Sequence, residues 1–303
     1  MPLGVEPPDA LASVSMGEGG TDLVTFELEG RRVHAKLEFD APTGSFKDRG
    51  AAMVIAAAVD LGASAVVADS SGNAGASFAT YAAHAGLDCD VFVPASTSLA
   101  KVGRISEAGA RVHAVKGTRD DTAAAAVSAV ESSDAFYASH VWNPWFPEGT
   151  KRIVTELHRQ LDGAWPDALV VPVGNGTLVL GARRALEELG VSVPIVAVQA
   201  EACAPIARAF RADVPSVAPV VAEPTVATGI AIGAPPRGDE VLAAVRASGG
   251  SVVTVTEDEI AAAVVELAAL GFAVEATAAV AVAGLTHVDA TEVALAITSG
   301  ARR

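Results

Sequence analysis

The chain has 303 residues, of which 51% are hydrophobic, so it is long and apolar enough to bury one large core or two smaller ones. Its 36 acidic and 21 basic residues give a formal net charge of -15, which argues against nucleic-acid binding, because phosphate backbones attract basic surfaces. Residues 1–14 show no signal-peptide pattern and the apolar runs are too short to span a membrane, so we expect a soluble, cytoplasmic protein without membrane contact.

The first elements along the chain are predicted to be two strands and a helix. Residues 23–28 and 32–39 have strand patterns on either side of a Glu29-Gly30 turn. An Ala-rich apolar pattern at residues 46–60 has the length of a helix, and Asp48 near its start favours the positive helix terminus. Lys47 is therefore expected at the beginning of a helix.

Short strands and helices alternate along the rest of the chain. The predicted strands are residues 64–68, 89–93, 111–115, 168–173 and 194–199. The predicted helices are residues 74–85, 99–108, 120–132, 149–161, 178–189 and 202–210. Residues 215–236 are irregular, and residues 251–255, 257–270, 276–286 and 292–297 complete the alternation. This pattern is typical of βαβ units and predicts an α/β fold with two parallel-sheet lobes and a cleft between them.

Cysteine and histidine usage indicates neither a disulfide framework nor a metal site. Cys89 and Cys203 are too few and too isolated, and the six histidines show no HExxH or other metal-ligand spacing. The acidic composition suits a protein kept soluble in concentrated salt, which screens the repulsion between like charges, or an acidic protein from ordinary surroundings.

Lys47 is the lysine whose setting points to chemistry. It is one of five lysines and lies in a small, Gly-punctuated loop, APTGSFKDRG at residues 41–50, that leads into the predicted helix. Partial desolvation there lowers the pKa of the amine and lets it form a Schiff base with a carbonyl cofactor. An ordinary surface lysine at a helix start fits the spacing of this motif equally well.

Four motifs in order resemble those of the fold-type II pyridoxal-phosphate enzymes. They are GEGGT at residues 17–21, PTGSFKDRG at residues 42–50, SSGNAGAS at residues 70–77 and GNGT at residues 174–177. Within the superfamily of tryptophan synthase beta and the serine/threonine dehydratases, these variants look like threonine synthase. The resemblance implies two mostly parallel twisted sheets flanked by helices, with the active site between the lobes. It assigns residues 41–141 to a small mobile domain, and residues 1–40 and 142–303 to a large cofactor-binding domain.

The resemblance implies a role for each cofactor-binding residue. Lys47 would hold pyridoxal 5'-phosphate covalently and then act as the base at the substrate Cα. The loop after the strand at residues 169–173 would cradle the cofactor phosphate with backbone N–H groups, although a ligand-free turn also fits its spacing. Thr298, with Ser299 as the alternative, would hydrogen-bond the pyridine nitrogen, and Asn73 would meet the 3-oxygen of the ring. The residues of the phosphate loop are Gly174, Asn175, Gly176 and Thr177.

Substrate binding is likewise assigned by resemblance. The loop Ser71, Gly72, Asn73 and Ala74 would grip the substrate carboxylate, while helix capping by Ser or Asn there is physically compatible. His140 is added because it precedes residues 143–151, which resemble the family's NPxRxxGQKT stretch.

Two positions depart from the threonine synthase pattern. Phe146 stands where those enzymes place an arginine that holds the substrate phosphate, and Ala74 stands where they have threonine after SSGN. Loss of a charge-assisted contact worth about 1.5–3 kcal/mol should weaken phosphate recognition. Trp142, Trp145 and Phe146 either wall a pocket for an apolar side chain or belong to the core. Basic residues such as Lys151 or Arg152 are candidates to compensate.

The function that follows is elimination or replacement on a small amino acid by a carbon–oxygen lyase with pyridoxal phosphate. The leading hypothesis is a threonine synthase-like conversion of O-phosphohomoserine to threonine and phosphate. This reaction implies a place in threonine biosynthesis. A serine/threonine ammonia-lyase or a cysteine-synthase-like β-replacement enzyme is the alternative within the enzymes. A cofactor-binding regulatory module without catalysis is the alternative from another class. The family also implies a homodimer.

Overall fold

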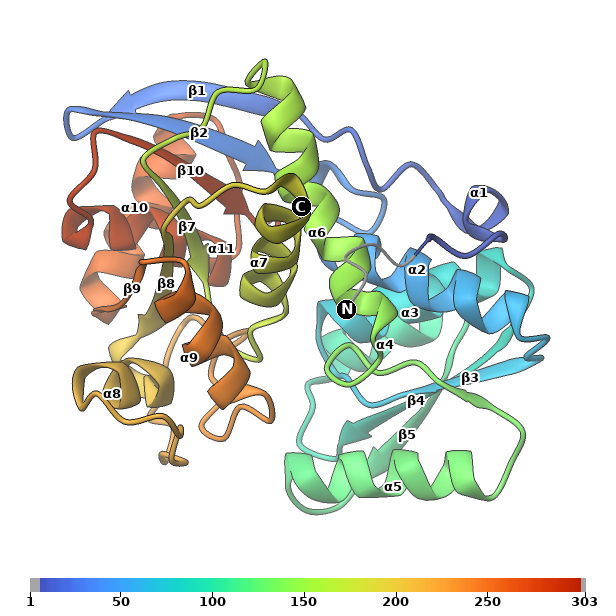
Figure 1. The fold of residues 1–303 in the computed structure, drawn as a ribbon. Coiled ribbons are helices and arrows are strands. Elements are labelled where there is room, and N and C mark those ends of the chain that lie inside the picture. Colours follow the sequence, from blue (N-terminus) through green and yellow to red (C-terminus); the bar gives the residue numbers. More distant parts are fainter. Residues whose placement is uncertain (1–5, 301–303) are drawn as a thin grey trace. The chain divides into compact units, whose positions relative to one another are not determined.

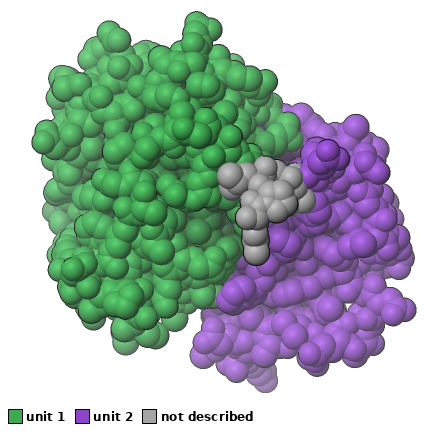
Figure 2. Space-filling model, viewed as in Figure 1, with its two compact units in different colours: residues 1–4, 19–40, 150–303 green, residues 5–18, 41–149 purple. Residues whose placement is uncertain are grey.

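The computed structural model of the chain describes residues 6–300 (Figure 1). Residues 1–5 and 301–303, at the two ends of the predicted large domain, lie outside the described part. The chain divides into two units, which Figure 2 shows in different colours. Among the described residues, the larger unit takes 19–40 and 150–300, and the smaller unit takes 6–18 and 41–149. The division falls within helix α6 (Trp145–Gln160).

The larger unit is built on a six-stranded sheet with the order β1-β2-β10-β7-β8-β9. Its strands are β1 (Leu23–Leu28), β2 (Arg31–Leu37), β7 (Ala168–Pro172), β8 (Ile195–Ala200), β9 (Ser251–Val255) and β10 (Glu292–Ile297). Only β1 runs antiparallel to its neighbour, and the other pairs are parallel. Loops after β10 and β7 therefore leave the same edge of the sheet on neighbouring strands.

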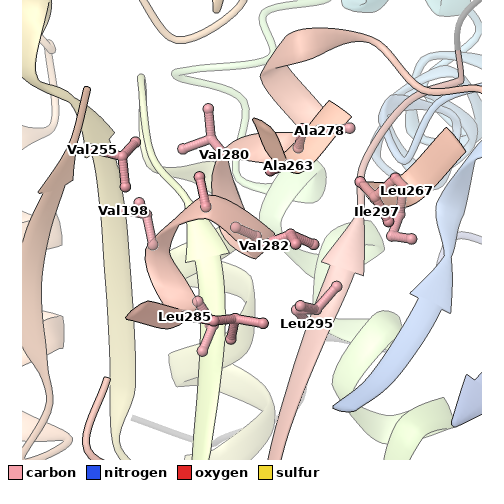
Figure 3. Packing of buried hydrophobic residues seen from close by; sticks show 14 of the residues in the cluster. Val198, Val255, Ala263, Leu267, Ala278, Val280, Val282, Leu285, Leu295 and Ile297 are labelled. Carbon is pink, nitrogen blue, oxygen red and sulfur yellow. The ribbon is translucent and has the colours of Figure 1, made fainter. Parts of the chain in front are cut away.

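Helices of the larger unit cover this sheet. They are α7 (Thr177–Leu189), α8 (Pro205–Arg211), α9 (Gly238–Ala247), α10 (Glu257–Ala269) and α11 (Ala276–Ala283), with short 3-10 turns at Glu38–Asp40, Glu201–Cys203 and Gly284–His287. Figure 3 shows Val198 of β8, Val282 of α11 and Leu295 of β10 gathered in one buried cluster. Because the sheet strands are apolar on both faces, a second cluster forms on the other side around Leu169, Ile195 and the helices α7 and α9.

The smaller unit holds a four-stranded parallel sheet with the order β5-β4-β3-β6. Its strands are β3 (Ala65–Ala68), β4 (Asp88–Pro94), β5 (Arg111–Val115) and β6 (Phe136–Tyr137). Its helices are α1 (Leu11–Val14), α2 (Lys47–Asp60), α3 (Asn73–His84), α4 (Leu99–Glu107) and α5 (Arg119–Glu131). The loops that follow the four parallel strands meet at one edge, where ligands bind in open α/β sheets.

Helix α2 is the buried centre of the smaller unit. Its residues from Asp48 to Ala58 are all buried, and alanine fills many of these positions, so α3 approaches closely. Glycine is required where α2 packs against the first turns of α6. A Cβ on Gly50 would lie 2.6 Å from the Phe146 ring, and one on Gly149 would lie 1.9 Å from the Arg49 carbonyl oxygen. The helix that carries Lys47 is therefore fixed by close contacts on several sides.

The observed elements follow the predicted alternation with four differences. The two-residue strand β6, the four-residue helix α1 and helix α9 were not predicted from the sequence. The predicted helix at residues 202–210 divides into a 3-10 turn and α8, because Pro205 begins a new helix. Along residues 6–300, no helix combines the length and apolar character needed to cross a bilayer.

Candidate active site

Lys47 is the first residue of α2, as the sequence predicted. Its Nζ lies 4.4 Å from the ring centre of Phe46 and 5.4 Å from that of Phe146. Burial, and to a smaller extent the positive charge of Arg119, lowers the pKa of Lys47 to about 7. A large part of these amines is then neutral at neutral pH, which is the form that attacks an aldehyde.

Asp48 holds the start of α2 in place. Its carboxylate accepts hydrogen bonds from the Thr43 backbone N–H at 2.6 Å and from the hydroxyls of Thr43 and Ser77, each at 2.6 Å. Burial raises the pKa of Asp48, and these hydrogen bonds oppose that shift. The Ser77 hydroxyl also lies 2.9 Å from the carbonyl oxygen of Asn73. Asp48 thus links the Lys47 loop to helix α3 and to the loop predicted to bind substrate.

The predicted substrate loop joins β3 to α3. A Cβ on Gly75 would lie 2.0 Å from the Ser70 carbonyl oxygen, so this tight turn requires glycine. Helix α3 begins after Gly72 without a side-chain cap, and within residues 6–300 the Ser71 side chain has no recorded hydrogen bond. Helix capping therefore does not occupy these groups. Ala74, by contrast, is buried in the core of the unit, so its methyl group does not replace the missing threonine hydroxyl.

Asn73 has a polar partner that the sequence did not indicate. Nη2 of Arg104, on α4, donates to Asn73 Oδ1 at 2.6 Å. Arginine only donates, so the amide oxygen must face it and the amide nitrogen points elsewhere. This orientation makes Nδ2 the group that can donate to an oxygen acceptor such as the cofactor's 3-oxygen.

His140 is buried close to Lys47. Burial is the main cause that lowers the pKa of His140 well below its usual range, and the positive charges of Lys47 and Arg119 add to it. The imidazole is therefore neutral. Its ring centre lies 6.1 Å from that of Phe146 in an edge-to-face arrangement. The smaller unit thus brings Lys47, His140 and Phe146 together.

Phe146 belongs to the core of the smaller unit. It is fully buried and meets Phe78 edge to face at 5.9 Å between ring centres. Trp145 lies against the same cluster, whereas Trp142 is 57% exposed. Core packing therefore accounts for Phe146 and Trp145, and the sequence alternative of an aromatic pocket wall is not needed. Lys151, a candidate to replace the missing arginine, forms an ion pair with Glu188 at 2.7 Å.

The larger unit contains the predicted phosphate loop between β7 and α7. Gly176 has a φ of 84°, and a Cβ there would lie 2.1 Å from Cγ2 of Val241. A Cβ on Gly174 would lie 2.9 Å from the Ile230 Cα. Helix α7 begins at the buried Thr177, and the N-cap residue provides no side-chain cap for the first N–H groups of the helix. A small cradle of backbone donors is what a phosphate needs.

Thr298 and Ser299 follow β10 at the same edge of this sheet. Each is 2% exposed. The Ser299 hydroxyl donates to Glu275 at 2.8 Å, whereas no hydrogen bond is recorded for the Thr298 hydroxyl within residues 6–300. The geometry favours Thr298 over Ser299 as the group left to meet a ligand.

The residues fit pyridoxal phosphate in each unit taken by itself. The smaller unit offers an amine of lowered pKa and an oriented asparagine, and the larger unit offers a glycine cradle and an uncommitted buried hydroxyl. No group of three potential metal ligands occurs among the described residues. The sequence did not predict that Asp48 anchors the Lys47 loop, or that the arginines at positions 104 and 119 lie near the site. Asp48 stood inside the SFKDRG motif, whereas neither arginine lies in a motif.

Comparisons with known proteins agree with this chemistry. Residues 14–300 match the family model described as "Pyridoxal-phosphate dependent enzyme". The threonine synthase of Methanosarcina acetivorans is 38% identical over 285 residues, which cover 90% of this chain and 70% of that protein. The threonine synthase of Methanocaldococcus jannaschii is 35% identical, with 95% and 75% covered. The crystal structure of a threonine deaminase from T.th. is similar with a TM-score of 0.85 at 25% identity, covering 97% of this chain and 96% of that one.

Proposed function

We propose, from the premise that the chain belongs to the pyridoxal-phosphate dependent enzyme family, that it is a threonine synthase-like lyase. The reaction is the conversion of O-phosphohomoserine and water to threonine and phosphate. The observation that carries the proposal is the Lys47 amine, whose pKa is lowered to about 7 at the start of a buried helix. The similarity to two curated threonine synthases over most of the chain supports the choice of reaction.

Each candidate residue takes a role that its setting supports. When bound, the cofactor supplies an electron sink that stabilises negative charge on the substrate carbon. The neutral amine of Lys47 would hold the cofactor aldehyde, and its Nζ would accept the proton from the substrate Cα. The neutral, buried His140 keeps a second positive charge away from that amine.

The remaining roles are those of binding and orientation. Residues 174–177 would hold the cofactor phosphate through backbone N–H groups, and the buried Thr298 would hydrogen-bond the pyridine nitrogen without charging the ring. Arg104 donates to Asn73 Oδ1, and Asn73 Nδ2 would donate to the 3-oxygen of the cofactor. The hydroxyl of Ser71 and the backbone N–H groups of residues 72–74 bind the substrate carboxylate.

The smaller unit acts as the small mobile domain and the larger unit as the cofactor-binding domain, in a cytoplasmic homodimer with a surface adapted to salt. The net charge of -15 supports the last point, because salt screens the repulsion between like charges. Size-exclusion chromatography with light scattering, together with activity at low and high salt, tests both statements. A monomer, or activity that falls as salt is raised, would contradict them.

A serine/threonine ammonia-lyase is the second candidate. It is favoured by Phe146, which removes the expected phosphate-binding arginine, and by the likeness to the T.th. threonine deaminase. The distinguishing experiment supplies the cofactor-loaded protein with O-phosphohomoserine, threonine, serine and O-acetylserine in parallel. We expect release of phosphate with formation of threonine, and no 2-oxo acid from threonine or serine. Ammonia and 2-oxo acid from threonine, without phosphate release, would replace the proposal by the alternative.

A further inference from the structure

The chain needs a phosphate-binding group that Phe146 does not provide. Phe146 is fully buried against Phe78 and Gly50, so an arginine side chain has no room in its place. A phosphorylated substrate carries about two negative charges and meets a protein of net charge -15. Local positive charge must therefore come from other residues close to Lys47 and the substrate loop.

Arg104 is one such residue. It projects from α4 and reaches the substrate loop itself, where Nη2 lies 2.6 Å from Asn73 Oδ1. Its side chain is partly buried, which reduces the screening of its charge by solvent. A guanidinium has five N–H donors, so one side chain can serve Asn73 and a second acceptor together.

Arg119 is the second residue that supplies positive charge near Lys47. It begins α5, is exposed, and has no hydrogen bond or ion pair recorded within residues 6–300. Thr118 and Asp121 form the capping box of that helix, so the arginine is not needed as a cap. Its positive charge lowers the pKa of both Lys47 and His140 and opposes the burial that raises the pKa of Asp69. Arg119 therefore lies within electrostatic reach of the lysine and of the residue that precedes the substrate loop.

The sheet topology explains why these groups converge. Strands β5, β4 and β3 are neighbours and run parallel, as Figure 1 shows. The turn before Arg119 follows β5, α4 follows β4, and the substrate loop with Asp69 follows β3. All three segments leave the same edge of the sheet. By contrast, Arg111 at the opposite end of β5 is already paired with Asp88 and Asp90.

We propose that Arg104 and Arg119 together bind the phosphate of O-phosphohomoserine, in place of the arginine that Phe146 replaces. This inference rests on the proposed function. Guanidinium groups suit the role because they present paired N–H donors to phosphate oxygens and keep their charge at every physiological pH. The two arginines approach the substrate loop from different helices, so they contact different oxygens of one phosphate.

The test uses the cofactor-loaded protein and four variants. Arg119→Ala removes the exposed charge, and Arg119→Lys keeps it. Arg104→Gln removes the charge but keeps an N–H donor for Asn73. Lys101→Ala is the matched control, since it removes an exposed cation from the same helix as Arg104. The measurements are KM and kcat for O-phosphohomoserine, the inhibition constant of inorganic phosphate, and the binding of threonine from the cofactor absorbance.

We expect KM for O-phosphohomoserine and the inhibition constant of phosphate to rise about 10- to 100-fold in Arg119→Ala and Arg104→Gln. Threonine carries no phosphate, so its binding should change less than about threefold in Arg119→Ala. Arg119→Lys should recover most of the loss, and Lys101→Ala should match the wild type. A wild-type KM for O-phosphohomoserine in Arg119→Ala or Arg104→Gln would contradict the proposal that both arginines bind the phosphate. An equal loss for threonine and O-phosphohomoserine in Arg119→Ala would indicate a structural role and overturn it as well.

Failure of the proposed function looks different. If the wild-type protein releases no phosphate from O-phosphohomoserine, the reaction assignment is wrong, whatever the variants do. The anion site is then judged with inorganic phosphate alone, from its effect on the cofactor absorbance. A phosphate response in the wild type that disappears in Arg119→Ala and Arg104→Gln supports the site. A response that is absent, or equal in all variants, rejects it.

Discussion

Gly176 offers a sharp test of the phosphate cradle, because α7 carries a matched glycine at its other end. Gly176 and Gly190 both have left-handed backbone angles, with φ of 84° and 67°. Alanine costs about 1–2 kcal/mol in that region at either position. Only at Gly176 does the new Cβ meet an obstacle, since it would lie 2.1 Å from Val241 Cγ2, whereas nothing lies within 4 Å at Gly190. Overpacking of this kind adds about 1–3 kcal/mol.

Two measurements follow for Gly176→Ala and Gly190→Ala. Urea unfolding of the cofactor-free proteins should show a loss of about 1–2 kcal/mol for Gly190→Ala and about 2–5 kcal/mol for Gly176→Ala. Titration with pyridoxal phosphate should show weaker binding, by about tenfold or more, only for Gly176→Ala, because its backbone no longer approaches the phosphate. Equal losses of stability and equal cofactor affinity in the two variants would refute the cradle.

Three further predictions concern the smaller unit. The free energy of unfolding, measured by thermal unfolding, should fall by about 3 kcal/mol or more in Phe146→Arg, because this variant buries a charge in the core. Phe146→Leu should lose less. A stable Phe146→Arg would show that the site is open. Asp48→Ala should cost at least about 1–3 kcal/mol, since the Thr43 backbone N–H loses its buried acceptor; unchanged urea stability would contradict this. Covalent capture of the cofactor by Lys47 should speed up as pH rises through about 7, because the amine loses its proton there. Arg119→Ala should shift the midpoint of this pH dependence upward, because it removes a positive charge that lowers the pKa of Lys47. A midpoint near the ordinary lysine value would contradict the burial of the amine.

The alternation of strands and helices was predictable because its signals are local. Apolar periodicity and Gly-rich turns fixed most elements, and the strand at Glu292–Ile297 agrees with its predicted range. Strand β6 escaped because two residues carry no period of their own, and their pairing with β3 depends on the whole sheet. Helix α9 lies beyond the Pro- and Gly-rich residues 215–236, where the irregular composition hid the start of a new pattern.

Site residues carried by local motifs were also predictable, whereas contacts that depend on the packed fold were not. Lys47 and the glycines of the phosphate loop were visible because motifs carry them, and their local geometry is what the motifs require. The choice between a pocket wall and the core at Phe146 was open, since it depends on which helices surround the ring. The contact between Arg104 and Asn73 joins residues from two different helices, and no spacing in the sequence announces it.

The covalent bond between Lys47 and the cofactor aldehyde is the central claim. Reduction of the cofactor-loaded protein with borohydride fixes the cofactor to the amine that holds it, and peptide mass spectrometry then identifies the residue. We expect the label on the peptide that contains Lys47 and its absence from the Lys47→Ala protein. A label on Lys36, Lys101, Lys116 or Lys151, or no label at all, would contradict the role of Lys47 and the chemistry built on it.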